Sequence, residues 1–434
     1  MICRRILIAV ITLGALMGMG MLQSCGGHSD RIDIENMERV MNMDSLVRVY
    51  MRTNPEEALA YIDSMETADE VSKPVICYCR GVVYNTMMQK TTSELYFKKA
   101  LEDDQLLRES PELYYKAHDY LASFLSNRGE NAEALAVATQ CYEVARQDDS
   151  PLGRQWTAIL LHAMGYFQTQ LGMKELAERN FSLSYMALSQ MVERDSSNNN
   201  LITYARVSYN ILDAYTSTEQ YDEALKWVSS AEIAAAKLSA NPQCLESDRV
   251  RFVGGVATQK AMVMAKLGMM DIADASYREA QEVGYFDTAY GILEQARFLR
   301  LTERWNELVE MIPKADSVAK EWNVPMSLYY MKEYMVPRFD AYLNSGMREK
   351  ALEVAELMAE SVDSVAAHEL NHEMTEIEVI AKQKDMNTEA AMQETVEAFR
   401  WVKILCVVLM LVIVVVSGCA IYQWKNLKKK TENK

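Results

Sequence analysis

The stretch Gly165–Ser184, GYFQTQLGMKELAERNFSLS, decides the fold that the sequence predicts. Gly165 is small enough to let two helices approach each other closely, and Gly172 interrupts the helical pattern. Ala177 and Phe181 follow one helical turn apart, so they share a face of the next helix. The stretch therefore predicts two amphipathic helices joined by a tight turn, with small residues at the crossing and an aromatic wedge between them.

The same arrangement recurs along the chain. The crossing residues of the successive second helices are Ala58, Ser93, Ala134, Ala177, Ala224, Ala273, Leu308 and Ala351. Their spacings are 35, 41, 43, 47, 49, 35 and 43 residues. This register places Ala177 and Ala224 in close helix contacts, and it places Glu178 on the solvent face.

The pattern resembles the tetratricopeptide repeat (TPR), W-x2-L-G-x2-Y followed by A-x3-F. Gln168 stands where the family usually has Tyr, and Ser184 stands where it usually has Ala. The TPR period is about 34 residues, so most units here have longer helices or turns. The resemblance covers about residues 45–360. It implies an all-α, TPR-like right-handed α-solenoid of about eight helix pairs, each contacting mainly its neighbours.

Helix breakers are scarce in this region and mark the expected helix ends. Asn54, Ser110 and Ser150 each precede a Pro, a combination typical of a capped helix start. Asp195–Asn200 is the clearest internal loop that the sequence predicts. Pro337 interrupts a helical stretch, so that helix is expected to kink or to start late.

The N-terminus is typical of a secretory signal. Two arginines precede the apolar run Ile6–Leu22, which ends in Leu22-Gln23-Ser24-Cys25. This ending resembles the bacterial lipobox, and the resemblance implies cleavage after residues 1–24 and lipidation of Cys25. The alternative is an uncleaved anchor helix in which the Cys is incidental. Residues 25–44 are polar, and we expect them to form a tether.

The C-terminus predicts one transmembrane helix. Ile404–Trp424 is a run of 21 residues without a charge and has Trp401 and Trp424 at its ends, so the span is expected over residues 401–424. Residues 361–400 form a juxtamembrane helical segment, and residues 425–434 a basic tail. Because basic residues favour the cytoplasmic side, the solenoid is expected in the periplasm of a bacterium and the protein in its inner membrane.

Charge and cysteine content exclude several functions. Outside the signal and the C-terminal membrane region the chain has 37 basic and 60 acidic residues, a net charge of −23. Such a surface repels nucleic acid, so no nucleic-acid partner is expected. Cys77 and Cys79 lack the two-residue gap of redox or zinc motifs, and we interpret them as small core residues.

A TPR stack exposes a groove formed by the first helix of each pair, and that groove is the expected binding surface. The resemblance places nine residues near it: Lys116, Asp119, His162, Tyr166, Arg206, Tyr209, Asn210, Arg297 and Arg300. Tyr and Arg are enriched at binding hot spots. Arg206, Arg297 and Arg300, with Asn210, would hold a peptide carboxylate. The alternative is a mixed, solvated face without a ligand.

One catalytic motif is present. His368, Glu369 and His372 form H-E-x-x-H, which resembles zinc metalloproteases and would make the protein a zinc-dependent hydrolase. The metzincin extension and a surrounding catalytic domain are missing, so a polar helix with two histidines is the simpler interpretation. The sequence therefore predicts no enzyme, no cofactor and no metal. It predicts a membrane-anchored scaffold that binds proteins or peptides.

The whole layout also resembles a group of bacterial membrane regulators. They have a signal, an extracytoplasmic TPR array, one transmembrane helix and a cytoplasmic DNA-binding output domain. The resemblance runs through Trp424 and stops there, because the ten-residue tail is too short to fold into a domain. It implies the sensing or scaffolding half of such a system. A further possibility is a sensor that signals through a cytoplasmic partner of the Lys-rich tail.

Overall fold

The computed structural model describes residues 54–362 except 69–70, 88 and 322–329, together with Val40, Asp44 and Val47. All of them belong to one compact unit, Glu35–Ile377. The described part is helical and contains no strand, as the all-α prediction requires. Val40 and Asp44 fall in the predicted tether, yet both are helical and buried.

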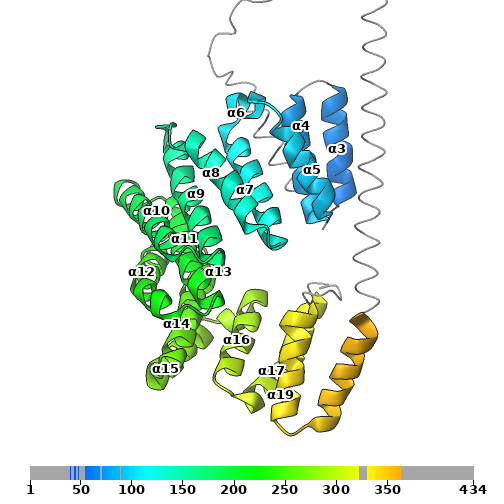
Figure 1. The fold of residues 1–434 in the computed structure, drawn as a ribbon, viewed down its shortest axis with the longest axis vertical. Helices are drawn as coiled ribbons and strands as arrows, with labels where there is room; N and C mark the ends of the chain where they lie inside the picture. The colour runs from blue at the N-terminus through cyan, green and yellow to red at the C-terminus, as the bar shows by residue number, and fades with distance from the viewer. Residues whose placement is uncertain are drawn as a thin grey trace, which may run out of the picture. The chain divides into compact units, whose positions relative to one another are not determined.

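The helices lie in chain order in Figure 1. Their bounds are α3 (Pro55–Thr67), α4 (Lys73–Thr86), α5 (Lys90–Ala100), α6 (Gln105–Glu109), α7 (Pro111–Asn127), α8 (Asn131–Ala145), α9 (Pro151–Gln170), α10 (Lys174–Arg194), α11 (Asn198–Ser217), α12 (Tyr221–Ser239), α13 (Glu246–Arg249), α14 (Gly255–Lys266), α15 (Met270–Glu282), α16 (Ala289–Leu301), α17 (Trp305–Glu321) and α19 (Val336–Asn344). Short turns of other helix types are η2 (Val250–Gly254), η3 (Tyr285–Asp287) and η4 (Met331–Met335). Residues 348–362 are also helical.

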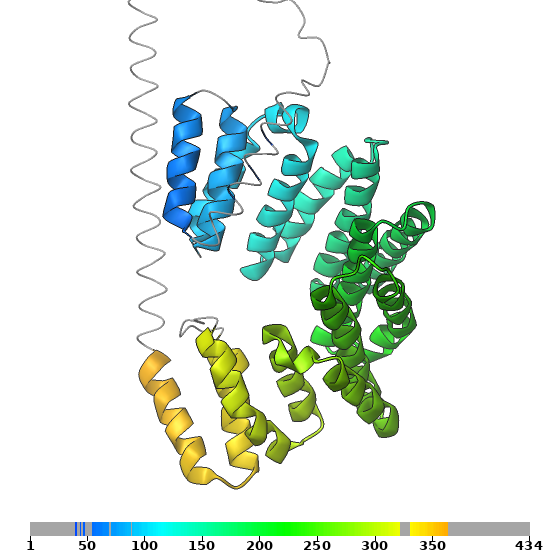
Figure 2. The same ribbon diagram turned by 180° about the vertical axis from the view of Figure 1, so that it is seen from behind.

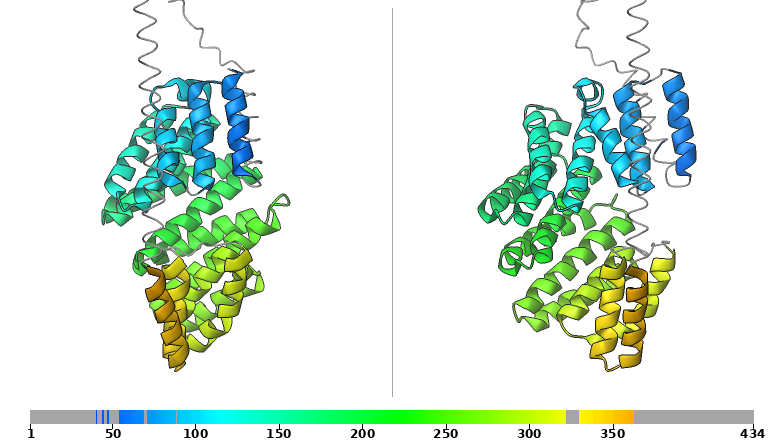
Figure 3. Two further views of the ribbon diagram at one scale, coloured as in Figure 1. Left: turned by 90° about the vertical axis from the view of Figure 1, so that its right-hand side faces the viewer. Right: turned by 45° about the vertical axis from the view of Figure 1, so that its right-hand side comes forward.

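The helices form consecutive antiparallel pairs. In the described residues the first helices are α4, α7, α9, α11, α14, α16 and α19, and each is followed by a second helix that packs against it. Seven of the predicted crossing residues lie on these second helices, Ala58 lies on α3, and all eight are at most 2% exposed. Figures 2 and 3 show the same order of neighbours from other sides. The repeat register that the sequence predicted is therefore confirmed for these positions.

In six of the described pairs the same kind of turn joins the two helices. The residue two positions before the start of the second helix has a left-handed backbone, with φ between +57° and +81°. In the best example Met173 N–H donates to the carbonyl of Gln168 at 2.8 Å, which closes the end of α9 in a Schellman-type arrangement. The left-handed residues are Gly129, Gly172, Glu219, Gly268, Glu303 and Gly346, each five positions before a buried crossing residue.

The aromatic wedge that the sequence predicted is present. A methyl group added at Gly165 would lie 2.6 Å from the Phe181 ring, and one at Gly81 would lie 2.9 Å from Phe97. Only a residue without a side chain lets the two helices come this close. Ser184, which departs from the TPR pattern, is buried and donates its hydroxyl to the carbonyl of Ala158 at 2.6 Å.

Several local predictions need correction. Glu178 is only partly exposed, and it accepts hydrogen bonds from Tyr215 at 2.9 Å and Trp227 at 3.2 Å. The loop at 195–200 is shorter than predicted, since α11 already starts at Asn198. Pro337 behaves as expected: it lies in the first turn of α19, which starts late after a π-helical turn.

The predicted signal peptide 1–24, Cys25, the span 401–424 and the tail 425–434 lie outside the described residues, as do His368, Glu369 and His372. Among the helices that are described, none is long and apolar enough to span a bilayer.

Candidate functional site

Two hollows open on the first-helix side of the stack. The larger has a volume of about 560 Å³ and is lined by α7, α9 and α11, three first helices in succession. The smaller, of about 500 Å³, is lined by α11, α14, α16 and the region of η4 and α19. We call them the Arg206 hollow and the Arg300 hollow after one lining residue of each. Both lie on the surface where the sequence predicted a groove.

The structure brings most of the predicted groove residues together. The Arg206 hollow is lined by six of them: Lys116, Asp119, His162, Tyr166, Arg206 and Asn210. Two more, Arg297 and Arg300, line the other hollow. Tyr209 lines neither, because its hydroxyl is hydrogen-bonded to the buried Glu294.

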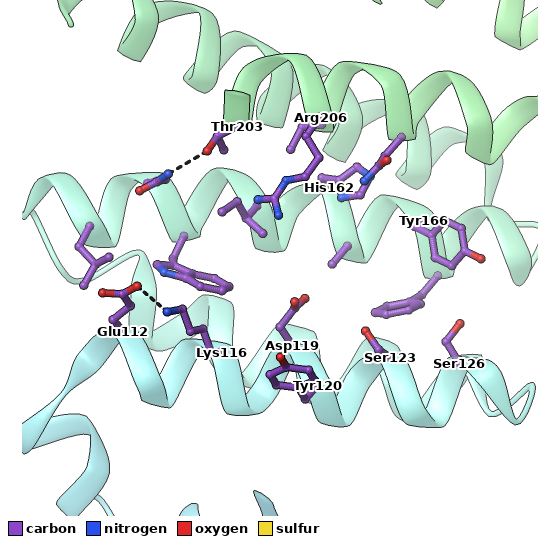
Figure 4. A pocket seen from close by; sticks show the side chains of 18 of the residues that line it. Glu112, Lys116, Asp119, Tyr120, Ser123, Ser126, His162, Tyr166, Thr203 and Arg206 are labelled. Carbon is purple, nitrogen blue, oxygen red and sulfur yellow. Dashed lines mark hydrogen bonds and ion pairs between the residues drawn. The ribbon is translucent and has the colours of Figure 1, made fainter. Parts of the chain in front are cut away.

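Helix starts and helical spacing explain how these side chains converge. Ser150 caps α9 by accepting a hydrogen bond from Gly153 N–H at 3.0 Å, and this fixes the first turn of that helix. His162 and Tyr166 then lie one turn apart on the face that borders the hollow. Figure 4 shows Asp119 reaching in from α7 and Arg206 from α11.

Lys116 is already neutralised within its own helix. Its ammonium lies 2.7 Å from a carboxylate oxygen of Glu112, one turn earlier on α7. A half-buried pair of this kind leaves little net charge for a ligand.

Arg206 and Asp119 are in a different state. Among the described residues neither side chain makes a hydrogen bond, and no carboxylate oxygen lies within 4.0 Å of the Arg206 guanidinium. They are nevertheless close enough to influence each other: burial raises the pKa of Asp119, and the Arg206 charge opposes that rise. The hollow therefore presents a guanidinium and a carboxyl group that face each other without forming an ion pair (Figure 4).

His162 adds a polar atom without a partner. Its Nε2 is buried and has no hydrogen bond to any described residue. Burial, together with the positive charge of Arg206, lowers the pKa of His162 to about 4. The imidazole is therefore neutral at physiological pH, and the hydrogen-bonding capacity of its buried Nε2 is unused by the described residues.

The Arg300 hollow contains pairs that are already formed. Arg297 lies 3.1 Å from Glu333, and Arg300 lies 2.6 Å from Asp340. The prediction that these two arginines await a peptide carboxylate is therefore not favoured, because both guanidiniums already have one within the protein.

A buried polar network lies at the Arg300 hollow, which its members Asp213 and Gln259 also line. Gln259 donates to Glu294 and to Asp213, at 3.0 Å in each case, and Tyr209 also donates to Glu294. Burial raises the pKa of Glu294 to about 7. Its Oε2 has no hydrogen-bond partner in the described structure. Three first helices, α11, α14 and α16, meet at this network.

Sequence reasoning missed some lining residues. Gln155, Trp156 and Ile159 line the Arg206 hollow from α9, and they lie three to seven positions before His162. Helical periodicity around His162 would have indicated them. Glu294 and Gln259 gave no such signal, because nothing in the sequence shows which helices meet.

The described residues contain side chains of the types that hold metal ions. No three His, Cys, Asp or Glu side chains within them are placed to hold a metal ion. Cys79 and Cys141 are buried, and burial raises the pKa of the Cys141 thiol, so it is a poor nucleophile.

Comparison with known proteins gives little more. No family model and no curated protein matches the sequence. The crystal structure of BtubC (BKLC) from P. vanneervenii is similar with a TM-score of 0.37 and 14% identity, over 57% of this chain and 89% of that chain. The apo form of RapI is similar with a TM-score of 0.35 and 16% identity, over 56% of this chain and 97% of that one. At these values neither likeness carries an argument about the fold or the function of this chain.

Proposed function

We propose that the protein is a non-enzymatic scaffold of the TPR type that binds proteins or peptides through its first-helix surface. The observation that carries the proposal is the Arg206 hollow, where polar side chains from three successive first helices converge on a space of about 560 Å³. Clefts of about 300–1,000 Å³ are typical of sites for small ligands. The hollow also has room for a few residues of a peptide.

The cellular setting belongs to the same proposal. The signal sequence, Cys25 and the apolar run Ile404–Trp424 support a lipid-anchored, membrane-spanning protein whose helical stack lies in the periplasm of a bacterium. In this setting the protein would be the sensing or scaffolding half of a regulatory system. A cytoplasmic partner of the tail Lys425–Lys434 would then carry the signal onward.

Site-specific photocrosslinking tests the binding role. A photoreactive amino acid replaces Tyr166, which lines the hollow, in the full-length protein in its own membrane. We expect a discrete crosslinked product that the additional substitution Arg206→Glu abolishes. The matched control carries the same photoreactive group at Arg179, an exposed residue of the second helix α10. Equal amounts of product from both positions would contradict the proposal. So would a product at Tyr166 that forms to the same extent with and without Arg206→Glu.

The absence of catalysis is part of the proposal and has its own test. His368→Ala combined with His372→Ala should change neither the zinc content of the purified protein nor its melting temperature. Zinc bound in a one-to-one ratio to the unmodified protein, and lost in the double variant, would favour the hydrolase instead.

A further inference from the structure

The charged groups that line the two hollows are not equivalent. Lys116, Arg297 and Arg300 each have a carboxylate partner at 3.1 Å or less. Among the basic residues that line either hollow in the described structure, Arg206 alone has none. The unpaired cation therefore occurs in the hollow that also contains the unpaired carboxylate of Asp119.

The separation of the two charges is informative. Arg206 and Asp119 each affect the pKa of the other, so they lie within electrostatic range. They do not form the direct ion pair that would cancel both charges. The Asp119 side chain is half-buried and burial raises its pKa, whereas Arg206 is exposed to the solvent in the hollow. A ligand that brings a carboxylate to Arg206 and an ammonium to Asp119 would supply the missing partner on both walls at once.

We propose that the Arg206 hollow binds a small zwitterion, a free amino acid or a short peptide with both ends unblocked. Its carboxylate pairs with the Arg206 guanidinium, and its ammonium pairs with the Asp119 carboxylate. The unpartnered Nε2 of His162 bonds to a polar group of the ligand between these two walls. This inference rests on the proposed binding function and narrows it to a ligand class.

The geometry favours a small ligand over a segment of a folded protein. Arg206 and Asp119 influence each other electrostatically across the hollow, so one small ligand with both charges can serve both groups. The α-ammonium and α-carboxylate of an amino acid or a short peptide provide these two charges. Trp156 and Ile159 supply apolar surface beside the charges, and this surface suits an uncharged side chain of the ligand.

Equilibrium dialysis of the full-length protein, read by mass spectrometry, tests the inference. The probes are a mixture of the twenty free amino acids and a randomised tripeptide library in four forms: unblocked, N-acetylated, C-amidated and blocked at both ends. We expect retention of the unblocked forms and a loss of roughly tenfold or more when either end is blocked, since each block removes one charge-assisted contact. Retention of amino acids or of tripeptides tells the two sources apart.

Two variants assign the contacts. In Arg206→Gln, retention should no longer depend on C-amidation, and in Asp119→Asn it should no longer depend on N-acetylation. The matched control is Arg249→Gln, a partly exposed arginine that pairs with Glu246 outside both hollows, and it should behave like the unmodified protein. Circular dichroism of each variant checks that its helix content is unchanged.

The outcomes separate this inference from the proposed function. Equal retention of the blocked and unblocked probes overturns the proposed zwitterion site. Retention of no probe in any form overturns it as well. If photocrosslinking at Tyr166 still gives its Arg206-dependent product in that case, the binding function stands with a different ligand. If both experiments fail, the scaffold function fails as well.

Discussion

Ala177 is a position where a small side chain allows two helices to pack closely. It is fully buried at a helix crossing, in the core cluster that contains Phe181. We expect Ala177→Phe to destabilise the protein by about 1–3 kcal/mol, because the larger side chain has to displace its neighbours. Urea unfolding followed by circular dichroism measures the change. The matched control is Leu176→Phe, where the same ring replaces a side chain that is 49% exposed.

Equal tolerance at positions 176 and 177 would contradict the register of α10. Glu178 is not a suitable control, although the sequence placed it in solvent. Its partners Tyr215 and Trp227 are 37 and 49 residues away in the chain, and no local pattern connects such positions. The sequence predicted which residues are buried because helical periodicity is local. It missed which polar residues are partnered because those partners come from the next pair.

Glu294 predicts an unusual pH dependence. Burial raises its pKa from the ordinary value of 4.5 to about 7 in the folded protein. Between these two values the folded protein holds a proton that the unfolded chain has released, so stability is fully present below about pH 4.5 and falls as the pH rises toward 7. The slope is at most about 1.4 kcal/mol per pH unit.

Urea unfolding at pH 5 and pH 7.5 measures this effect. Glu294→Gln keeps a neutral side chain of the same shape at both pH values. We therefore expect the variant to gain stability relative to the unmodified protein as the pH rises. A difference between the two proteins that stays constant with pH would show that Glu294 titrates alike in the folded and unfolded states.

At the scale of elements, the turn between the two helices of a pair has either glycine or glutamate at its left-handed position. Gly172 has φ +71° and Glu303 has φ +57°. A left-handed backbone costs a residue with a side chain roughly 1–2 kcal/mol, and glycine is free of this cost. We expect Gly172→Ala to destabilise by about 1 kcal/mol and Glu303→Gly to stabilise by up to about 1 kcal/mol. Thermal unfolding of both variants measures the opposite signs.

The empty space around Gly172 excludes a steric clash as the cause of any effect of Gly172→Ala. No atom lies within 4 Å of an added methyl group there, so a loss of stability would come from the backbone alone. Unchanged stability in both variants would show that the turns relax without cost. The sequence predicted the turn at Gly172 from its glycine, but it gave no such signal at Glu219 or Glu303, because a glutamate carries no local signal for a left-handed backbone.

The same reasoning explains how much of the site was predictable. The repeat register places Lys116, His162 and Arg206 on first helices, so six of the nine predicted residues line one hollow. Their state of pairing was not predictable. Arg300 and Arg206 look alike in the sequence, and only the contact of α16 with α19 gives Arg300 its partner Asp340.

At the scale of the whole molecule, the orientation in the membrane is the prediction to test. A tag inserted after Ser196, in the exposed turn between α10 and α11, should be accessible from outside the cytoplasm. A reporter fused after Lys434 should be active only inside the cytoplasm, because the tail is rich in lysine. Protease treatment of spheroplasts is the measurement. A Ser196 tag that is protected in intact spheroplasts would reverse the orientation.

The packing of each helix mainly against its neighbours in the chain has a kinetic consequence. Contacts between residues close in sequence form quickly, because little chain entropy is lost when short loops close. A pair such as α9 and α10 is complete within 44 residues, from Pro151 to Arg194. Folding is therefore expected to begin at any pair and to spread in both directions, so the first pairs can be ordered while the last are still being synthesised.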